Sequence, residues 1–180
     1  MPGQSQPAGQ YLFRHRSEYA GAEIIAPSVS ISRPSFCYAP DIAAGKSRRD
    51  DESAFLRITK KLGLNPDTTP VSCPLASGGW GGAMGPSQFI PTTWEGLESS
   101  IMKAANSSTA NPWNPEHAVI ATSIYVGRLG AKAQTYTAER NAACSYYSGR
   151  ACSGSNEFYG NSVMNIAAKL QKDIDFLKDN

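Results

Sequence analysis

The sequence predicts a mainly α-helical fold with glycine-rich loops and little strand. Apolar residues recur at helical spacing in the second half of the chain, and residues typical of helix starts and stops border these segments. The two-residue alternation of a strand is nearly absent. With 180 residues, the chain is long enough to form one domain with its own core.

The first 47 residues differ in composition from the rest. Residues 1–47 are rich in Pro, Ser, Gly and Ala and show little hydrophobic periodicity. One short strand is predicted there, at 23–31. We therefore divide the chain into a divergent or partly disordered N-terminal segment, 1–47, and a folded domain, 48–180.

The folded domain is predicted to begin with two helices. Acidic residues open the first, over 51–62, and lysines close it before Gly63. The second is predicted from 93 to about 105, because Thr92 and Glu95 have the spacing of a capping box.

Three further helices complete the predicted fold. Asn114 and Pro115 suit the N-cap and the first position of a helix that stops at Gly130. A short helix follows from 138 to about 147. Apolar residues at helical spacing predict a terminal amphipathic helix from about 162 to 178.

The four cysteines are Cys37, Cys73, Cys144 and Cys152. None forms a C-x-x-C pair, so the pattern argues against zinc. Two interpretations remain open. One is a pair of disulfides, Cys144–Cys152 and Cys37–Cys73, which would place the protein in the cell envelope or outside the cell. The other is four buried free thiols. No export signal is visible at the start of the sequence.

Charge and hydropathy exclude several classes of partner. The net charge of +2, without a block of Lys or Arg, argues against nucleic acid. No apolar run approaches the roughly 20 residues that span a bilayer. His15 and His117 lack metal-ligand spacing, so no metal and no cofactor are expected. We expect a monomer.

The most unusual segment is the glycine-rich stretch 78–91. Its glycines let the backbone approach a ligand closely. The Gln88 amide can bind the hydroxyl and acetamido groups of a sugar, and Trp80 and Phe89 can supply apolar faces. The alternative is an ordinary tight loop in which Met84 and Phe89 belong to the core.

The string GAMGPSQFIPTTW, residues 82–94, resembles the signature of the lytic murein transglycosylases, which cleave the glycan strands of bacterial peptidoglycan. The branch that contains membrane-bound lytic transglycosylase B is the most similar. Nine of the thirteen positions match the pattern Gly-Ala-Met-Gly-x-x-Gln-Phe-x-Pro-Ser/Thr-x-Trp/Tyr. A second block, NAACSYYSG, resembles the family's late Ala-x-x-Tyr-Asn-x-Gly element, with Tyr146 on its tyrosine and Tyr147 in place of its asparagine.

The resemblance covers roughly 48–180 and implies a lysozyme-like helical domain that acts on peptidoglycan glycan strands. It implies that one glutamic acid protonates the leaving oxygen and then removes a proton from the muramic 6-hydroxyl, which gives a 1,6-anhydro product. The substrate-binding residues that it implies are Met84, Gln88, Phe89, Tyr146 and Tyr147.

The resemblance places the catalytic acid before the signature, where the sequence offers Glu18 and Glu23. Neither has the family's Glu-Ser/Thr-x-x-Gly context. Two functions therefore stay open: a lytic transglycosylase, and a peptidoglycan-binding module of the same fold without an acid.

Overall fold

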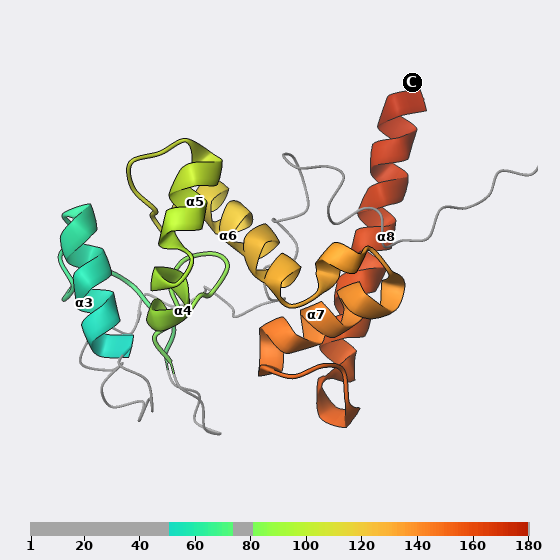
Figure 1. Ribbon diagram of the computed structural model, residues 1–180, viewed down its shortest axis with the longest axis horizontal. Coiled ribbons are helices and arrows are strands. Elements are labelled where there is room, and N and C mark those ends of the chain that lie inside the picture. Colours follow the sequence, from blue (N-terminus) through green and yellow to red (C-terminus); the bar gives the residue numbers. More distant parts are fainter. Residues whose placement is uncertain (1–50, 74–80, 180) are drawn as a thin grey trace, which may run out of the picture. The chain divides into compact units, whose positions relative to one another are not determined.

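The computed structural model describes residues 51–73 and 81–179 of the chain. In this part the protein is mainly α-helical, with six α-helices and no strand, as the sequence predicts (Figure 1). The helices are α3 (Asp51–Leu62), α4 (Pro91–Glu95), α5 (Glu98–Ala105), α6 (Pro115–Arg128), α7 (Tyr136–Ser148) and α8 (Glu157–Asp179), with the short 3₁₀ turns η2 (Ala131–Ala133) and η3 (Gly154–Asn156). The predicted strand at 23–31 and the boundary at residue 47 lie outside the described residues.

The described residues fall into two compact units, with the division between Ala121 and Thr122. We call the residues up to 121 the first unit and those from 122 the second unit. The fully buried side chains of the first unit are mostly large; they include Phe55, Ile58, Met84, Trp94, Leu97 and Ile101. The second unit buries smaller residues on α7: Ala142 and Ala143 both pack against elements next to this helix.

Helix α3 has the predicted bounds, but the side chain of its first residue, Asp51, caps the start of another helix, α4. Asp51 is only 4% exposed, and one of its carboxylate oxygens accepts hydrogen bonds from the Thr92 backbone N–H at 3.1 Å and from the Thr92 hydroxyl at 2.6 Å. An acceptor from a distant part of the chain therefore satisfies a free N–H at the start of α4. Ion pairs of Arg57 with Glu95 and of Lys61 with Glu98 also join α3 to the helices that follow.

The single helix predicted from 93 to 105 is wrong. Two helices, α4 and α5, occupy this segment, with a turn at 96–97 between them. The expected capping box of Thr92 and Glu95 does not form. Ile90 is the N-cap of α4, Pro91 is its first residue, and Glu95 instead accepts two hydrogen bonds from Arg57.

Helix α6 starts as predicted. The Asn114 side chain accepts hydrogen bonds from the backbone N–H groups of Glu116 and His117, at 2.8 and 3.3 Å. The His117 ring is buried, and its Nδ1 accepts a hydrogen bond from the Asn111 backbone. This hydrogen bond therefore fixes the loop that leads into α6.

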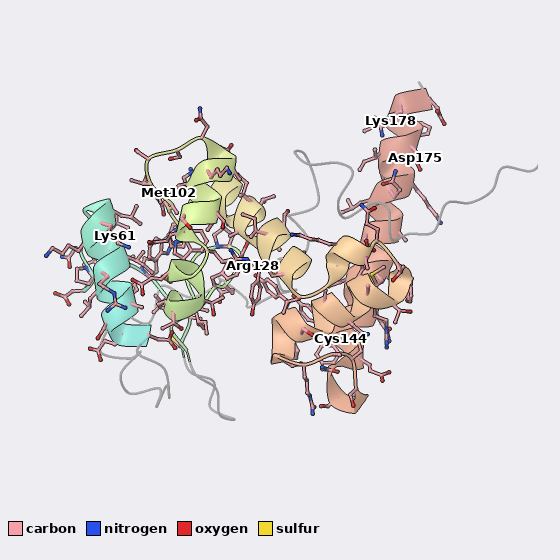
Figure 2. The ribbon with its side chains drawn as sticks, in the orientation of Figure 1. Lys61, Met102, Arg128, Cys144, Asp175 and Lys178 are labelled. Carbon is pink, nitrogen blue, oxygen red and sulfur yellow. A yellow bond between two sulfur atoms is a disulfide. The ribbon has the colours of Figure 1, made fainter. Side chains whose placement is uncertain are left out.

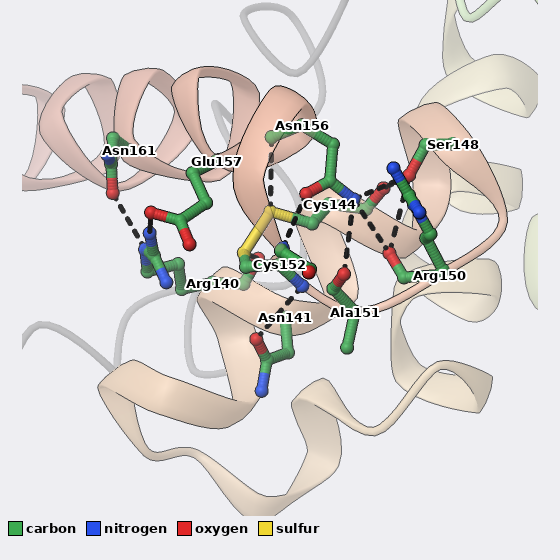
Figure 3. Close-up of a disulfide and its surroundings, with 11 residues drawn as sticks. Arg140, Asn141, Cys144, Ser148, Arg150, Ala151, Cys152, Asn156, Glu157 and Asn161 are labelled. Atoms are coloured by element: carbon green, nitrogen blue, oxygen red, sulfur yellow. Dashed lines mark hydrogen bonds and ion pairs between the residues drawn. A yellow bond between two sulfur atoms is a disulfide. The ribbon is translucent and has the colours of Figure 1, made fainter.

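The second unit is built around α7 and α8, which pack against each other. A disulfide joins Cys144 in α7 to Cys152 in the connecting loop, which agrees with the first of the two interpretations of the cysteines (Figure 3). Cys73 is also disulfide-bonded, and its expected partner, Cys37, lies outside the described residues. Gly160 of α8 lies so close that a β-carbon there would be 2.5 Å from the Cys144 sulfur.

Helix α8 begins five residues before the predicted start at 162. A capping box between Ser153 and Asn156 orders η3, and α8 continues directly from it. The Asn156 amide also donates to Ser148, Arg150 and Ala151 (Figure 3). Farther along α8, Asp175 and Lys178 lie on its exposed distal part (Figure 2). None of the described helices combines the length and apolar character that a bilayer crossing requires.

Candidate functional site

The signature segment forms a tight turn in the first unit. Met84 pairs with Phe89 and with Val71 through isolated β-bridges, and the Met84 N–H donates to the Phe89 carbonyl at 2.8 Å. The turn between them spans 85–88, and the Gln88 N–H donates back to the Gly85 carbonyl. The bridges therefore join the two ends of the turn to each other and join its first end, Met84, to Val71.

Gly85 lies very close to the backbone of Pro112. Its φ is +61°, and a β-carbon would lie 1.9 Å from the Pro112 carbonyl oxygen. No side chain fits that gap, so glycine is required twice, for conformation and for space. The Ser87 hydroxyl, which donates to the Ala118 carbonyl at 3.2 Å, fixes the other side of the turn.

Gln88 has a left-handed backbone, with φ of 53°, which is uncommon outside glycine. Its side-chain Nε2 donates to the Gly85 carbonyl at 2.8 Å, and this bond orients the amide. No hydrogen bond to its Oε1 is present in the described part of the chain. The side chain is half-buried. Gln88 therefore presents an oriented acceptor that is free to receive a ligand hydroxyl or amide.

Met84 and Phe89 lie in the core. Their side chains are 1% and 4% exposed, and the Phe89 ring packs edge-on against Trp94 at 5.7 Å between centroids. In this arrangement the two side chains belong to the core on which the turn rests. Contact of either side chain with substrate stays a prediction, and Trp80 lies outside the described residues.

Tyr146 and Tyr147 are neighbours on α7 with different surroundings. The Tyr146 ring packs edge-on against Tyr125 at 5.6 Å, and burial raises the pKa of its hydroxyl despite a hydrogen bond with Thr122. The Tyr147 side chain is 55% exposed and stacks on Tyr159 at 4.8 Å. Both tyrosines belong to the second unit, whereas Gln88 belongs to the first.

Glu139 is a carboxyl group that the sequence did not single out. It lies in the first turn of α7 and is 1% exposed, and neither of its oxygens has a hydrogen-bond partner. Burial raises the pKa of this group to about 8. The available signal was its spacing, because Glu139, Ala142, Ala143 and Tyr146 share one face of the predicted helix.

The predicted catalytic residues Glu18 and Glu23 lie outside the described residues. Among the residues that are described, no cluster of His, Cys, Asp or Glu has the arrangement of a metal site. The structure thus brings Met84, Gln88 and Phe89 together in one turn and places Tyr146 beside Tyr147.

Comparison with known proteins adds no relative. Scans of protein-family models, of curated proteins and of solved structures each found no match to this chain.

Proposed function

We propose that this chain is a lysozyme-like helical domain that cleaves peptidoglycan glycan strands as a lytic transglycosylase. The observation that carries the proposal is the signature segment 82–94, with the turn at 85–88 within it. Its sequence resembles the transglycosylase signature, and its geometry gives the signature residues specific tasks. Gly85 lets the turn pack tightly against the Pro112 backbone, and the oriented amide of Gln88 supports a role for its oxygen as the acceptor of a sugar hydroxyl.

The proposed reaction needs one carboxyl group. The protonated acid gives its proton to the glycosidic oxygen as the bond to the muramic anomeric carbon breaks. The resulting carboxylate then takes the proton of the muramic 6-hydroxyl while that oxygen bonds to the anomeric carbon. The acid is regenerated, and the ring closes as a 1,6-anhydro sugar without water. This route differs from two-carboxylate hydrolysis because the substrate supplies the nucleophile.

Glu18 and Glu23 are the proposed candidates for that acid. Glu139 has the proton affinity that such an acid needs, but both of its oxygens are sealed from solvent. A proton donor must reach the leaving oxygen within hydrogen-bond distance. We therefore do not assign the proton-donor role to Glu139.

The cysteines support the proposed setting of the reaction. The Cys144–Cys152 disulfide and the bonded state of Cys73 fit an oxidising compartment. We propose the cell envelope or the extracellular space, where peptidoglycan is found, and a monomer as the working form.

The test is incubation of the full chain with purified peptidoglycan, followed by mass analysis of the released muropeptides. Products lighter than hydrolytic fragments by one water, with 1,6-anhydro ends, are expected. Loss of these products in Glu18→Gln or in Glu23→Gln would identify the acid. Reducing ends without anhydro sugars would contradict the proposed chemistry.

The second candidate is a peptidoglycan-binding module without catalysis, which the free Gln88 acceptor favours equally. It predicts no anhydro product but retention of the chain on insoluble peptidoglycan. Gln88→Ala is expected to weaken that retention. Gln134→Ala is the matched control, because Gln134 is also a half-buried glutamine with a left-handed backbone, φ 54°. Equal retention of both variants would rule out the turn as the contact.

A further inference from the structure

The two buried acidic side chains of the described residues differ in their partners. Asp51 accepts two hydrogen bonds from Thr92. Glu139 accepts none, although both of its oxygens are fully enclosed. A buried polar group without a partner is rare in folded proteins and calls for an explanation.

Within the described residues, the elements packed around α7 provide no charged partner for Glu139. α7 packs on η2, η3 and α8, and its buried face also meets the end of α6. The titratable or charged side chains near the packed ends of these elements are Lys132 on η2, Tyr125 and Arg128 on α6, Glu157 and Tyr159 on α8, and Tyr136, Arg140, Tyr146 and Tyr147 on α7 itself; η3 has none. None of them forms a hydrogen bond or ion pair with Glu139.

Arg140, the neighbour of Glu139 in sequence, is already engaged. Its guanidinium donates to the Asn161 side chain at 2.7 Å and to Glu157 at 3.2 Å (Figure 3). Both partners belong to α8. Arg140 therefore ties α7 to α8 and does not pair with the Glu139 carboxyl.

The charge state of Glu139 follows from this enclosure. An ionised carboxylate without a partner is very costly to hold away from water, whereas the neutral acid costs far less. The small side chains of Ala142 and Ala143, on the same face, are both buried. They let neighbouring elements approach α7 closely.

We propose that Glu139 is a proton-dependent latch: in its neutral form it lets α7 pack against η2 and α8, and loss of its proton loosens this packing. The enclosed, unpartnered carboxyl carries the inference. The latch is closed while the proton is bound, so the second unit loses stability as the pH rises. The direction agrees with the raised pKa of about 8, above the ordinary value of 4.5.

The test is thermal unfolding of the full chain from about pH 5 to about pH 9, with Glu139→Gln as the main variant. The amide is nearly isosteric with the neutral acid but cannot ionise. We expect the wild-type Tm to fall by roughly 10 °C more than that of the variant across this range. Glu157→Gln is the control, because this exposed carboxyl is paired with Arg140, and its pH profile should follow the wild type.

A second measurement does not depend on how the variant folds. Carboxyl carbons of glutamate, labelled with ¹³C, are titrated by NMR in the wild-type chain. One carbon with a midpoint near pH 8 is expected. The latch is overturned if every glutamate titrates near its ordinary pKa, or if Glu139→Gln keeps the full wild-type fall in Tm.

Discussion

The two units of this protein solve the problem of packing helices in different ways. The first unit fills its interior with large side chains such as Phe55 and Trp94, and polar pairs close its edges. The second unit brings helices together over alanines and a glycine, and a disulfide joins α7 to the loop that follows it. Glu139, the buried acid of the second unit, lies on the same face of α7 as two of these alanines. The comparison teaches that the two units are sensitive to different changes. The first unit is sensitive to the shape of the side chains in its core. The second unit is sensitive to the distance between its packed elements and to the protonation state of Glu139.

The largest effect is expected where the first unit has no spare space. Gly85→Ala would place a methyl group 1.9 Å from the Pro112 oxygen at a positive φ. We expect a loss of about 3–5 kcal/mol in the free energy of unfolding, measured by chemical denaturation. The matched control is Gly63→Ala, which has φ of +66° but no atom within 4 Å. It should cost about 1 kcal/mol. Equal losses would show that conformation alone matters at Gly85.

The next effect tests the approach of α8 to the disulfide. Gly160→Ala would set a β-carbon 2.5 Å from the Cys144 sulfur and 2.8 Å from the Cys152 sulfur. Overpacking of this kind is expected to cost about 2 kcal/mol, although alanine favours a helix. The same change in a Cys144→Ala, Cys152→Ala background should cost much less. A cycle without coupling between these sites would refute the proposed clash.

A smaller effect is expected from the hydrogen bonds by which Asp51 of α3 caps α4. Asp51→Ala removes the acceptor of the Thr92 N–H and hydroxyl and should cost about 1–2 kcal/mol. The exposed neighbour provides the control, because Glu52→Ala should change stability by no more than about 0.5 kcal/mol. Urea denaturation of both variants measures the difference. A loss no larger than that of the control would mean that water replaces Asp51 at α4.

The smallest effect is expected at the edge of the first unit. Arg57 donates to both oxygens of Glu95, but its side chain is 51% exposed. Arg57→Ala should therefore cost about 0.5 kcal/mol, and about 1 M salt should remove most of that difference. Lys60→Ala is the unpaired control on the same helix. A loss above about 2 kcal/mol would mean that this pair is part of the unit's framework rather than its edge.

Local chemistry allowed much of the fold to be predicted from the sequence. The bounds of α3 follow from acids, lysines and Gly63, and the start of α6 follows from Asn114 and Pro115. The Cys144–Cys152 bond follows from short spacing. In each case, the decisive residues lie within a few positions of the feature that they set.

The remaining features depend on residues far apart in the sequence. The start of α4 was mispredicted because Asp51, 41 positions before Thr92, takes the place of the expected capping box. The candidate turn was found from its signature, but the burial of Met84 and Phe89 depends on the packing around them. Glu139 was missed for the same reason, since its burial depends on how other elements pack around α7.

The enclosed carboxyl of Glu139 also has a thermochemical consequence. Between the ordinary glutamate pKa and about 8, folding takes up a proton at this position and unfolding releases it. The released proton is absorbed by the buffer, whose own heat of ionisation enters the calorimetric signal. The apparent enthalpy of unfolding near neutral pH should therefore differ between phosphate and Tris, even where Tm is the same, and the slope against buffer ionisation enthalpy should report about one proton.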